Sequence, residues 1–129
     1  MESFTVSTVL PATEKQIYEA WLSSEGHSQM TGSQAEVEGR SGGTFKAWDG
    51  YIWGKTLEVE PNRRIIQSWR TSEFPEDSPD SRVEILLEEV SERTKATLIH
   101  TEIPDGQGEG YKQGWDDFYF TPMRAYFSR

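Results

Sequence analysis

The sequence predicts an α+β fold in which a curved antiparallel sheet packs around a long C-terminal helix. Between residues 35 and 100, apolar residues alternate with polar ones over several short segments, as in half-buried strands. Short turns join these segments, which favours antiparallel neighbours. Residues 109–127 instead carry aromatic residues at helical spacing around much of the girth, so this helix needs cover on several sides.

The N-terminal part of the chain is predicted to form one strand and two short helices. Residues 4–10 alternate between apolar and polar side chains, and Pro11 ends the strand. Thr13 and Gln16 have the spacing of a capping box, so a helix is expected to start there. Ser24 is the expected N-cap of the second short helix.

About six further strands follow, because the apolar period changes to two near residue 35. Their alternating residues are Ala35 and Val37; Phe45 and Ala47; Tyr51, Trp53, Leu57 and Val59; Ile65, Gln67 and Trp69; Val83, Ile85 and Leu87; and Ala96, Leu98 and His100. Asp49 and Gly50 mark a hairpin turn. The result is a sheet of about six or seven strands in a single domain, residues 1–129.

The C-terminal segment is predicted to be one long helix with a disturbance. Tyr111, Trp115 and Phe118 fall along one face of it. Pro122 removes one helical hydrogen bond and clashes with the preceding turn, at a cost of ~3 kcal/mol. We therefore expect a kink near Tyr119, or a break with Pro122 in the first turn of a second piece.

The composition argues against several classes of protein. The formal net charge of −9 disfavours nucleic acid and anionic membrane surfaces as partners. The absence of cysteine excludes disulfide frameworks, thiolate zinc sites and cysteine nucleophiles. No apolar run reaches the roughly 20 residues of a membrane span, and the first ten residues do not resemble a signal peptide. We expect a soluble, cytoplasmic protein.

No residue pattern points to a metal, a cofactor or a catalytic nucleophile. The two histidines, His27 and His100, lie far apart in the sequence and lack the local spacing of metal ligands. No nucleophile elbow is present. His27 stands in a polar stretch and is expected to be exposed. His100 shares a strand face with Leu98, so it either lines an internal site or is a hydrogen-bonded histidine at the rim of the core.

Residues 72–80 form an acidic loop with an aromatic residue in it. Phe74, Glu76 and Asp77 are candidates for contact with a partner, since acidic side chains steer basic surfaces and an exposed aromatic side chain can anchor an interface. Alternatively, the acidic side chains only keep the surface solvated and Phe74 folds back onto the sheet.

Short motifs of a known kind follow one another along nearly the whole chain. They are Gly42-Gly43-Thr44-Phe45, Asp49-Gly50, Gly54, Ile65-Ile66, Trp69-Arg70, Phe74-Pro75-Glu76, Ile103-Pro104, Gly114-Trp115, Tyr119-Phe120 and Phe127. In this order and spacing they resemble the C-terminal domain of the activator of heat-shock protein 90 ATPase, in the START-like (SRPBCC) superfamily. The resemblance implies a helix-grip fold and, as in many members, a cavity between the helix and the sheet.

The resemblance also implies a partner and a site. In the activator, this domain helps to bind the chaperone and to stimulate its ATPase, so a chaperone of the heat-shock protein 90 type and a part in the stress response are expected. The residues expected to line the cavity are Trp53, Trp69, Leu98, His100, Tyr111, Trp115 and Phe118. Either their side chains leave room for a flat or apolar ligand, or they fill the space themselves.

Three functional hypotheses follow. The first is a non-catalytic binding module that holds an apolar small molecule or a protein partner between the C-terminal helix and the sheet. The second is a cavity enzyme, similar to the cyclases and dehydratases of the superfamily, acting on a small hydrophobic or aromatic substrate. Its acid or base would be His100, Tyr51, Tyr111 or Glu102. The third is a chaperone accessory that acts through its surface while its cavity is filled.

Overall fold

The computed structural model describes all residues from 1 to 129 and has the α+β helix-grip fold expected from the sequence. The strands are β1 (Glu2–Leu10), β2 (Glu36–Val37), β3 (Thr44–Ala47), β4 (Ile52–Glu60), β5 (Arg64–Thr71), β6 (Ser81–Val90) and β7 (Arg93–Ile103). The helices are α1 (Glu14–Trp21), α2 (Ser24–Thr31), α3 (Gly108–Trp115), the π-helical segment η1 (Asp116–Phe120) and α4 (Thr121–Phe127).

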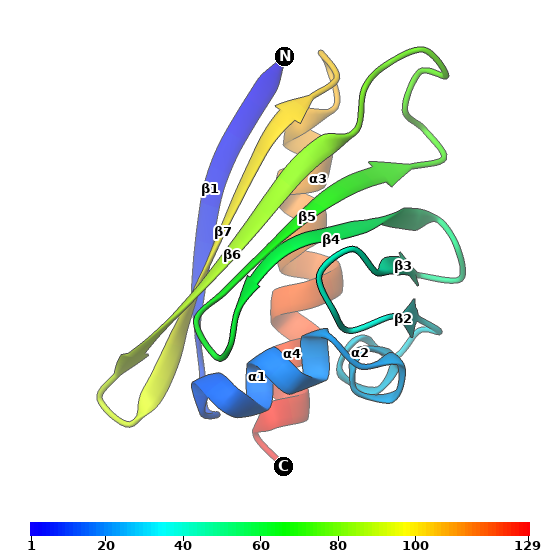
Figure 1. The fold of residues 1–129 in the computed structure, drawn as a ribbon. Coiled ribbons are helices and arrows are strands. Elements are labelled where there is room, and N and C mark those ends of the chain that lie inside the picture. The colour runs from blue at the N-terminus through cyan, green and yellow to red at the C-terminus, as the bar shows by residue number, and fades with distance from the viewer.

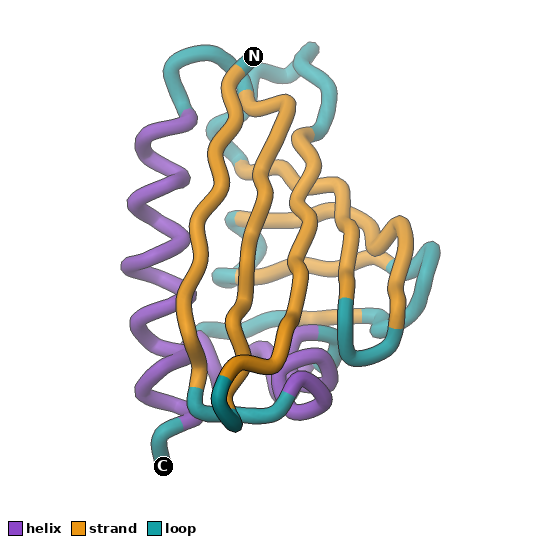
Figure 2. Tube along the Cα trace, turned by 90° about the vertical axis from the view of Figure 1, so that its left-hand side faces the viewer, coloured by secondary structure: helices purple, strands orange, loops and turns teal.

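The seven strands form one antiparallel sheet in the order β1-β7-β6-β5-β4-β3-β2. The sheet curves around the C-terminal helix, which runs along its concave side (Figures 1 and 2). The short helices α1 and α2 close one end of this arrangement beside α4, as Figure 1 shows. The first strand pairs with the last, so the N-terminus reaches the start of α3.

Rows of side chains that cross the sheet build the core. One row joins Val59, Ile65, Ile85, Leu98 and Val6 on five neighbouring strands. Because side chains alternate between the two faces of a strand, every member of the row points to the same side. The buried members of this row belong to the same apolar cluster as the buried aromatic residues of the C-terminal helix.

The caps of the two short helices follow from their serine and threonine residues. Thr13 accepts the N–H of Gln16 and forms the expected capping box with it, so this prediction is confirmed. The expected N-cap of the second helix was wrong by one residue: Ser23 has extended backbone angles and accepts the N–H of Gly26. Ser24 begins the helix, and its hydroxyl accepts the N–H of Val37.

The C-terminal helix continues without a break from Gly108 to Phe127 (Figure 2). The disturbance expected near Tyr119 takes the form of the π-helical segment η1, in which the N–H of Thr121 donates to the carbonyl of Asp116, five residues earlier. Pro122 then stands in the first turn of α4. A π-helical turn shifts the hydrogen-bond pattern by one residue, which gives the chain a way to pass the proline without ending the helix. None of the helices combines the length and the apolar character that a membrane crossing needs.

Candidate functional site

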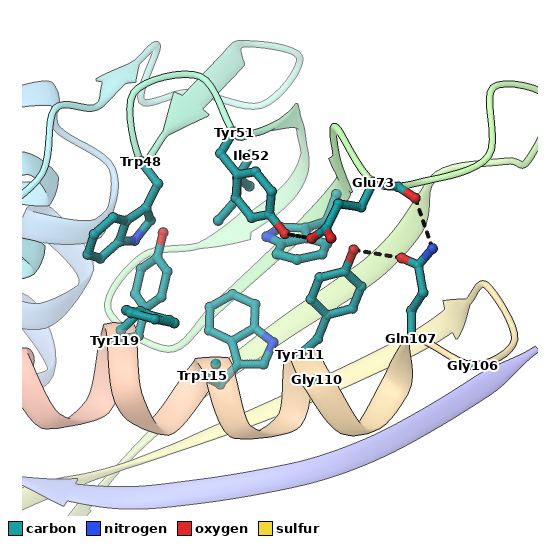
Figure 3. Close-up of a pocket in the computed structure, with 13 residues that line it drawn as sticks. Trp48, Tyr51, Ile52, Glu73, Gly106, Gln107, Gly110, Tyr111, Trp115 and Tyr119 are labelled. Carbon is teal, nitrogen blue, oxygen red and sulfur yellow. Dashed lines mark hydrogen bonds between the residues drawn. The ribbon is translucent and has the colours of Figure 1, made fainter.

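A cavity of about 690 Å³ lies between the C-terminal helix and the adjacent part of the sheet (Figure 3). It extends from the Trp48 turn to the first turn of α3. Its walls are mostly aromatic. They are formed by Trp48, Tyr51, Ile52, Trp69, Glu73, Gly106, Gln107, Gly110, Tyr111, Gly114, Trp115, Phe118 and Tyr119. A volume of this size falls within the range of small-molecule sites.

Helical spacing brings four of the aromatic walls together. Tyr111, Trp115 and Tyr119 follow one another at intervals of four residues, so they share the face of the helix that points to the sheet. Phe118, three residues after Trp115, stands at the edge of this face and is 55% exposed. Trp115 packs against Trp69 from β5, with ring centroids 5.6 Å apart, and against Tyr119 at 4.7 Å. These contacts fix the orientation of the rings.

Two glycines on the same helix keep the cavity open. Gly110 and Gly114 are both part of its lining. A Cβ atom added at Gly110 would meet no other atom within 4 Å, and one added at Gly114 would find Phe118 Cδ2 at 3.7 Å, an ordinary contact. Neither glycine is therefore required by crowding of the backbone. Their effect on the cavity is to leave two positions of its helical wall without a side chain, between the aromatic residues.

A hydrogen-bonded chain crosses the mouth of the cavity beside α3. The hydroxyl of Tyr51 donates to the carboxylate of Glu73. The side-chain amide of Gln107 donates to the backbone carbonyl of Glu73 at 2.9 Å, and its oxygen accepts the hydroxyl of Tyr111 at 2.7 Å (Figure 3). Tyr111 also bonds with Thr71 at 2.7 Å. These hydrogen bonds connect the start of α3 to the loop that follows β5.

The two tyrosines at the mouth are in their neutral form, because their pKa values lie above the ordinary value of 10. Desolvation, and then the hydrogen bond to Glu73, raise the pKa of Tyr51 above its ordinary value. Desolvation likewise raises the pKa of Tyr111. Both hydroxyls therefore act as neutral hydrogen-bonding groups at physiological pH. They add no negative charge to the cavity.

His100 lies behind the cavity wall and is fully buried. Trp115 donates its Nε1–H to Nδ1 of His100 at 3.1 Å. The proton of the imidazole is therefore on Nε2, which donates to Ser81 Oγ at 2.8 Å, while the Ser81 hydroxyl donates to the carbonyl of Trp69. Burial lowers the pKa of His100 to about 3. The ring is neutral, both nitrogens are engaged, and it orients Trp115.

His27 is buried, with 2% of its surface exposed, so the expectation that it would be exposed was wrong. Its Nδ1 contacts the carbonyl of Trp21 at 2.9 Å, and its Nε2 contacts the hydroxyl of Tyr119 at 2.8 Å. Burial lowers its pKa to about 4. The helical spacing of His27, Met30 and Thr31, the buried face of α2, was the available signal, and the polar neighbours concealed it.

The seven cavity residues expected from the sequence fall into three groups. Trp69, Tyr111, Trp115 and Phe118 line the cavity. Leu98 and His100 are buried outside its lining. Trp53 is 38% exposed and lies on the opposite face of β4, because the neighbouring Ile52 points inward instead.

The four candidates for acid–base chemistry also differ in whether they line the cavity. Tyr51 and Tyr111 line the cavity, whereas His100 and Glu102 do not. The wall residues that sequence reasoning overlooked include Trp48, Glu73 and Gln107. Trp48 stands in a turn with a positive φ of 53°, which is uncommon for a residue other than glycine, and its ring packs edge-on against Phe118. Alternation along a strand does not reveal a residue of this kind.

The three residues expected to contact a partner lie in two environments. Phe74 is only 7% exposed and packs against Trp69 and Tyr111, while the guanidinium of Arg70 lies 5.3 Å from the centre of its ring. It is part of the core and not an exposed anchor. Glu76 and Asp77 are exposed on the same loop.

A curved sheet that grips a C-terminal helix, with an aromatic cavity between them, defines a helix-grip domain of the START-like kind. Within this class, the chain belongs to the family described as Activator of Hsp90 ATPase homolog 1-like protein, whose model matches residues 11–128. The resemblance seen in the sequence is thereby confirmed.

Two curated relatives illustrate the relationship. The Activator of 90 kDa heat shock protein ATPase homolog 2 of Mus musculus is 27% identical over 120 residues, which cover 93% of this chain and 36% of that protein. The Activator of 90 kDa heat shock protein ATPase homolog 1 of Homo sapiens is 23% identical over 123 residues, which cover 95% of this chain and 36% of that protein. The chain thus spans about a third of the length of the curated relatives it matches.

A solved structure matches over the whole fold. The HSP90 activator from Plasmodium falciparum superposes with a TM-score of 0.87 at 24% identity, covering 97% of this chain and 95% of that chain. This likeness shows that the two chains share a fold.

Proposed function

We propose that the chain is a non-catalytic binding module that holds an apolar small molecule in the cavity between the C-terminal helix and the sheet. Membership of the activator-homologue family supports a binding module of that general kind. The observation that carries the finer proposal is the cavity of about 690 Å³, which its aromatic walls surround without filling. A largely apolar pocket with a few polar groups at one end is typical of a small-molecule site.

The engagement of the polar groups argues for binding over catalysis. Both nitrogens of His100 are used by Trp115 and Ser81, so this ring offers no free base to the cavity. Tyr51 and Tyr111 are held in hydrogen bonds to protein groups. A cyclase or dehydratase would need a positioned acid or base within reach of its substrate. Of the four candidates expected from the sequence, none offers a free acid or base to the cavity, and the one carboxylate of the lining, Glu73, lies at its mouth.

The cytoplasm remains the expected compartment of the protein.

Native mass spectrometry of the purified protein tests the proposal. Under gentle spray we expect a population that carries the added mass of one drug-sized molecule, which is lost under denaturing spray. A cavity of this size accommodates a drug-sized molecule. If the mass stays bare even after incubation with a panel of flat apolar compounds, the cavity is not a ligand site.

A second candidate function is contact with a chaperone of the heat-shock protein 90 type, favoured by the names of the relatives. We propose that the exposed Glu76 and Asp77 meet a basic surface of such a partner. Hydrogen bonds from Arg70 to the carbonyls of Pro75 and Ser78 support their loop. Charges at the rim of an interface mainly change association rate and salt dependence.

A charge-reversal experiment tests this second candidate. Glu76→Lys combined with Asp77→Lys should weaken binding to the chaperone and any stimulation of its ATPase, most strongly at low salt. The matched control is Glu88→Lys with Glu89→Lys, two exposed acidic residues near the β6–β7 turn, at the other end of the sheet in Figure 1. Equal effects of the two pairs would mean that only net charge matters, and the loop contact would be wrong.

A further inference from the structure

The lining of the cavity contains one charged side chain. Glu73 contributes the one carboxylate among the lining residues, and none of the lining residues is a lysine, an arginine or a histidine. The remaining walls are aromatic rings, one isoleucine, one glutamine and three glycines. A ligand that enters the cavity therefore meets a single charge, and this charge is negative.

The carboxylate of Glu73 has no cationic partner in the protein. It takes part in none of the ion pairs of the structure. Arg70, the nearest basic residue in the sequence, is engaged by Asp80 and by the carbonyls of Pro75 and Ser78. The charge of Glu73 is therefore available to a cation bound in the cavity.

The position of Glu73 is fixed from several sides. Its backbone N–H donates to Thr71 Oγ1, and its backbone carbonyl accepts the side chain of Gln107. Tyr51 donates to one oxygen of its carboxylate, Oε2, while Oε1 accepts no hydrogen bond from the protein. One acceptor oxygen is therefore held in place at the mouth and unused.

The aromatic walls of the cavity favour a cationic ligand, as the carboxylate of Glu73 does. Tyr51 and Tyr111 lie next to Glu73 in Figure 3, and Trp69 and Trp115 line the same cavity. The face of an aromatic ring carries a negative partial charge, which attracts cations and repels anions. A carboxylate among aromatic rings combines charge attraction with cation–π contact.

From these features we infer that the cavity selects a cationic amine carried on a flat, apolar body, with the ammonium group at Glu73 and the body between the helix and the sheet. This inference rests on the proposed function, because it names the chemical class of the ligand for the same cavity. Glu73 is exposed at the mouth, so water screens its charge and the selectivity is expected to be moderate.

Three probes with one aromatic body test the selectivity. Calorimetric titration with 1-naphthylmethylamine, 1-naphthylmethanol and 1-naphthylacetate compares a cation, a neutral molecule and an anion. We expect the amine to bind at least about fivefold more tightly than the alcohol, and the carboxylate to bind most weakly. In Glu73→Gln, which retains an oxygen for Tyr51, the amine and the alcohol should agree within about twofold. Glu76→Gln, on the same loop but outside the lining, should keep the preference.

The outcomes separate the two proposals. If the alcohol binds but the amine binds no better, or if Glu73→Gln leaves the preference unchanged, the cationic selectivity is wrong and the binding function stands. If none of the three probes binds, the proposed function fails, and the selectivity fails with it.

Discussion

At the scale of single residues, the two histidines show how burial determines the protonation state of a side chain. His27 and His100 are both buried, and each uses both ring nitrogens in hydrogen bonds within the protein. Their partners, Tyr119 and Trp115, are walls of the cavity. The histidines therefore hold the rings that a ligand would touch, and a proton added to either ring would disturb those bonds.

This arrangement predicts a loss of stability in mild acid. Burial lowers the pKa of His27 to about 4 and that of His100 to about 3, against an ordinary value of 6.5. Below pH 6.5 the unfolded chain binds protons that the folded chain does not, so the free energy of unfolding falls as the pH drops. Urea unfolding at pH 5 should give a value lower than at pH 7, by up to about 2 kcal/mol for each histidine. Equal midpoints at the two pH values would contradict the buried, neutral state.

Two tryptophans with opposite exposure supply a second prediction. Trp115 is 3% exposed and packs against Trp69 and Tyr119, so Trp115→Ala should lower the free energy of unfolding by ~3–5 kcal/mol. Trp53→Ala, on the outer face of β4, should cost less than about 1 kcal/mol. Chemical unfolding of both variants measures the difference. Similar losses would mean that the helix is wrongly placed against the sheet.

At the scale of elements, the first strand holds the start of the C-terminal helix. Glu2 of β1 accepts the N–H groups of Gly106 and Gly108 at 3.0 and 2.7 Å, although more than one hundred residues separate them in the sequence. These hydrogen bonds lower the pKa of Glu2. The carboxylate thus caps the first turn of α3, where free N–H groups favour an anion. Since Gly106 and Gln107 line the cavity, the same contact supports its mouth.

Removal of this cap should loosen the mouth. In Glu2→Ala we expect faster amide hydrogen exchange at Gly106 and Gly108, whose donors lose their acceptor, with little change in the middle of the sheet. Glu109→Ala is the matched control, because this acidic residue of the same turn accepts no such bond. Unchanged exchange in Glu2→Ala would show that the strand does not hold the helix.

The elements were easier to predict than the direction of single side chains. Alternation revealed the strands, and the aromatic spacing revealed the long helix, because a period of two or of 3.6 residues repeats over many positions. The prediction for Trp53 was wrong because a shift of one residue in a strand reverses the face. The predicted N-cap Ser24 was wrong by one position because Ser23 and Ser24 are both suitable caps. Trp48 and Glu73 lie in a turn and a loop, where no period exists, so only the fold brings them to the cavity.

At the scale of the whole molecule, the two ends of the helix grip are built differently. Helices α1 and α2 close one end, where the bond between His27 and Tyr119 joins α2 to the C-terminal helix (Figure 1). At the other end, the loop after β5 and the turn before α3 meet through hydrogen bonds of Glu73 and Gln107. Loops held by a few polar contacts open more readily than a packed core. We therefore expect ligands to enter beside α3.

A variant that fills part of the cavity is the sharpest test of whether this cavity binds a ligand. Gly114→Leu adds a side chain to the cavity wall, and an added Cβ meets only an ordinary contact. Helix propensity should make this variant at least as stable as the native protein, and Gly114→Ala is the small control. Titration with the neutral probe N-phenyl-1-naphthylamine should show saturable binding at one site in the native protein and in Gly114→Ala. Binding should be weaker in Gly114→Leu, whose side chain takes up part of the cavity. Equal binding by a folded Gly114→Leu variant, or no saturable binding by the native protein, would contradict the account.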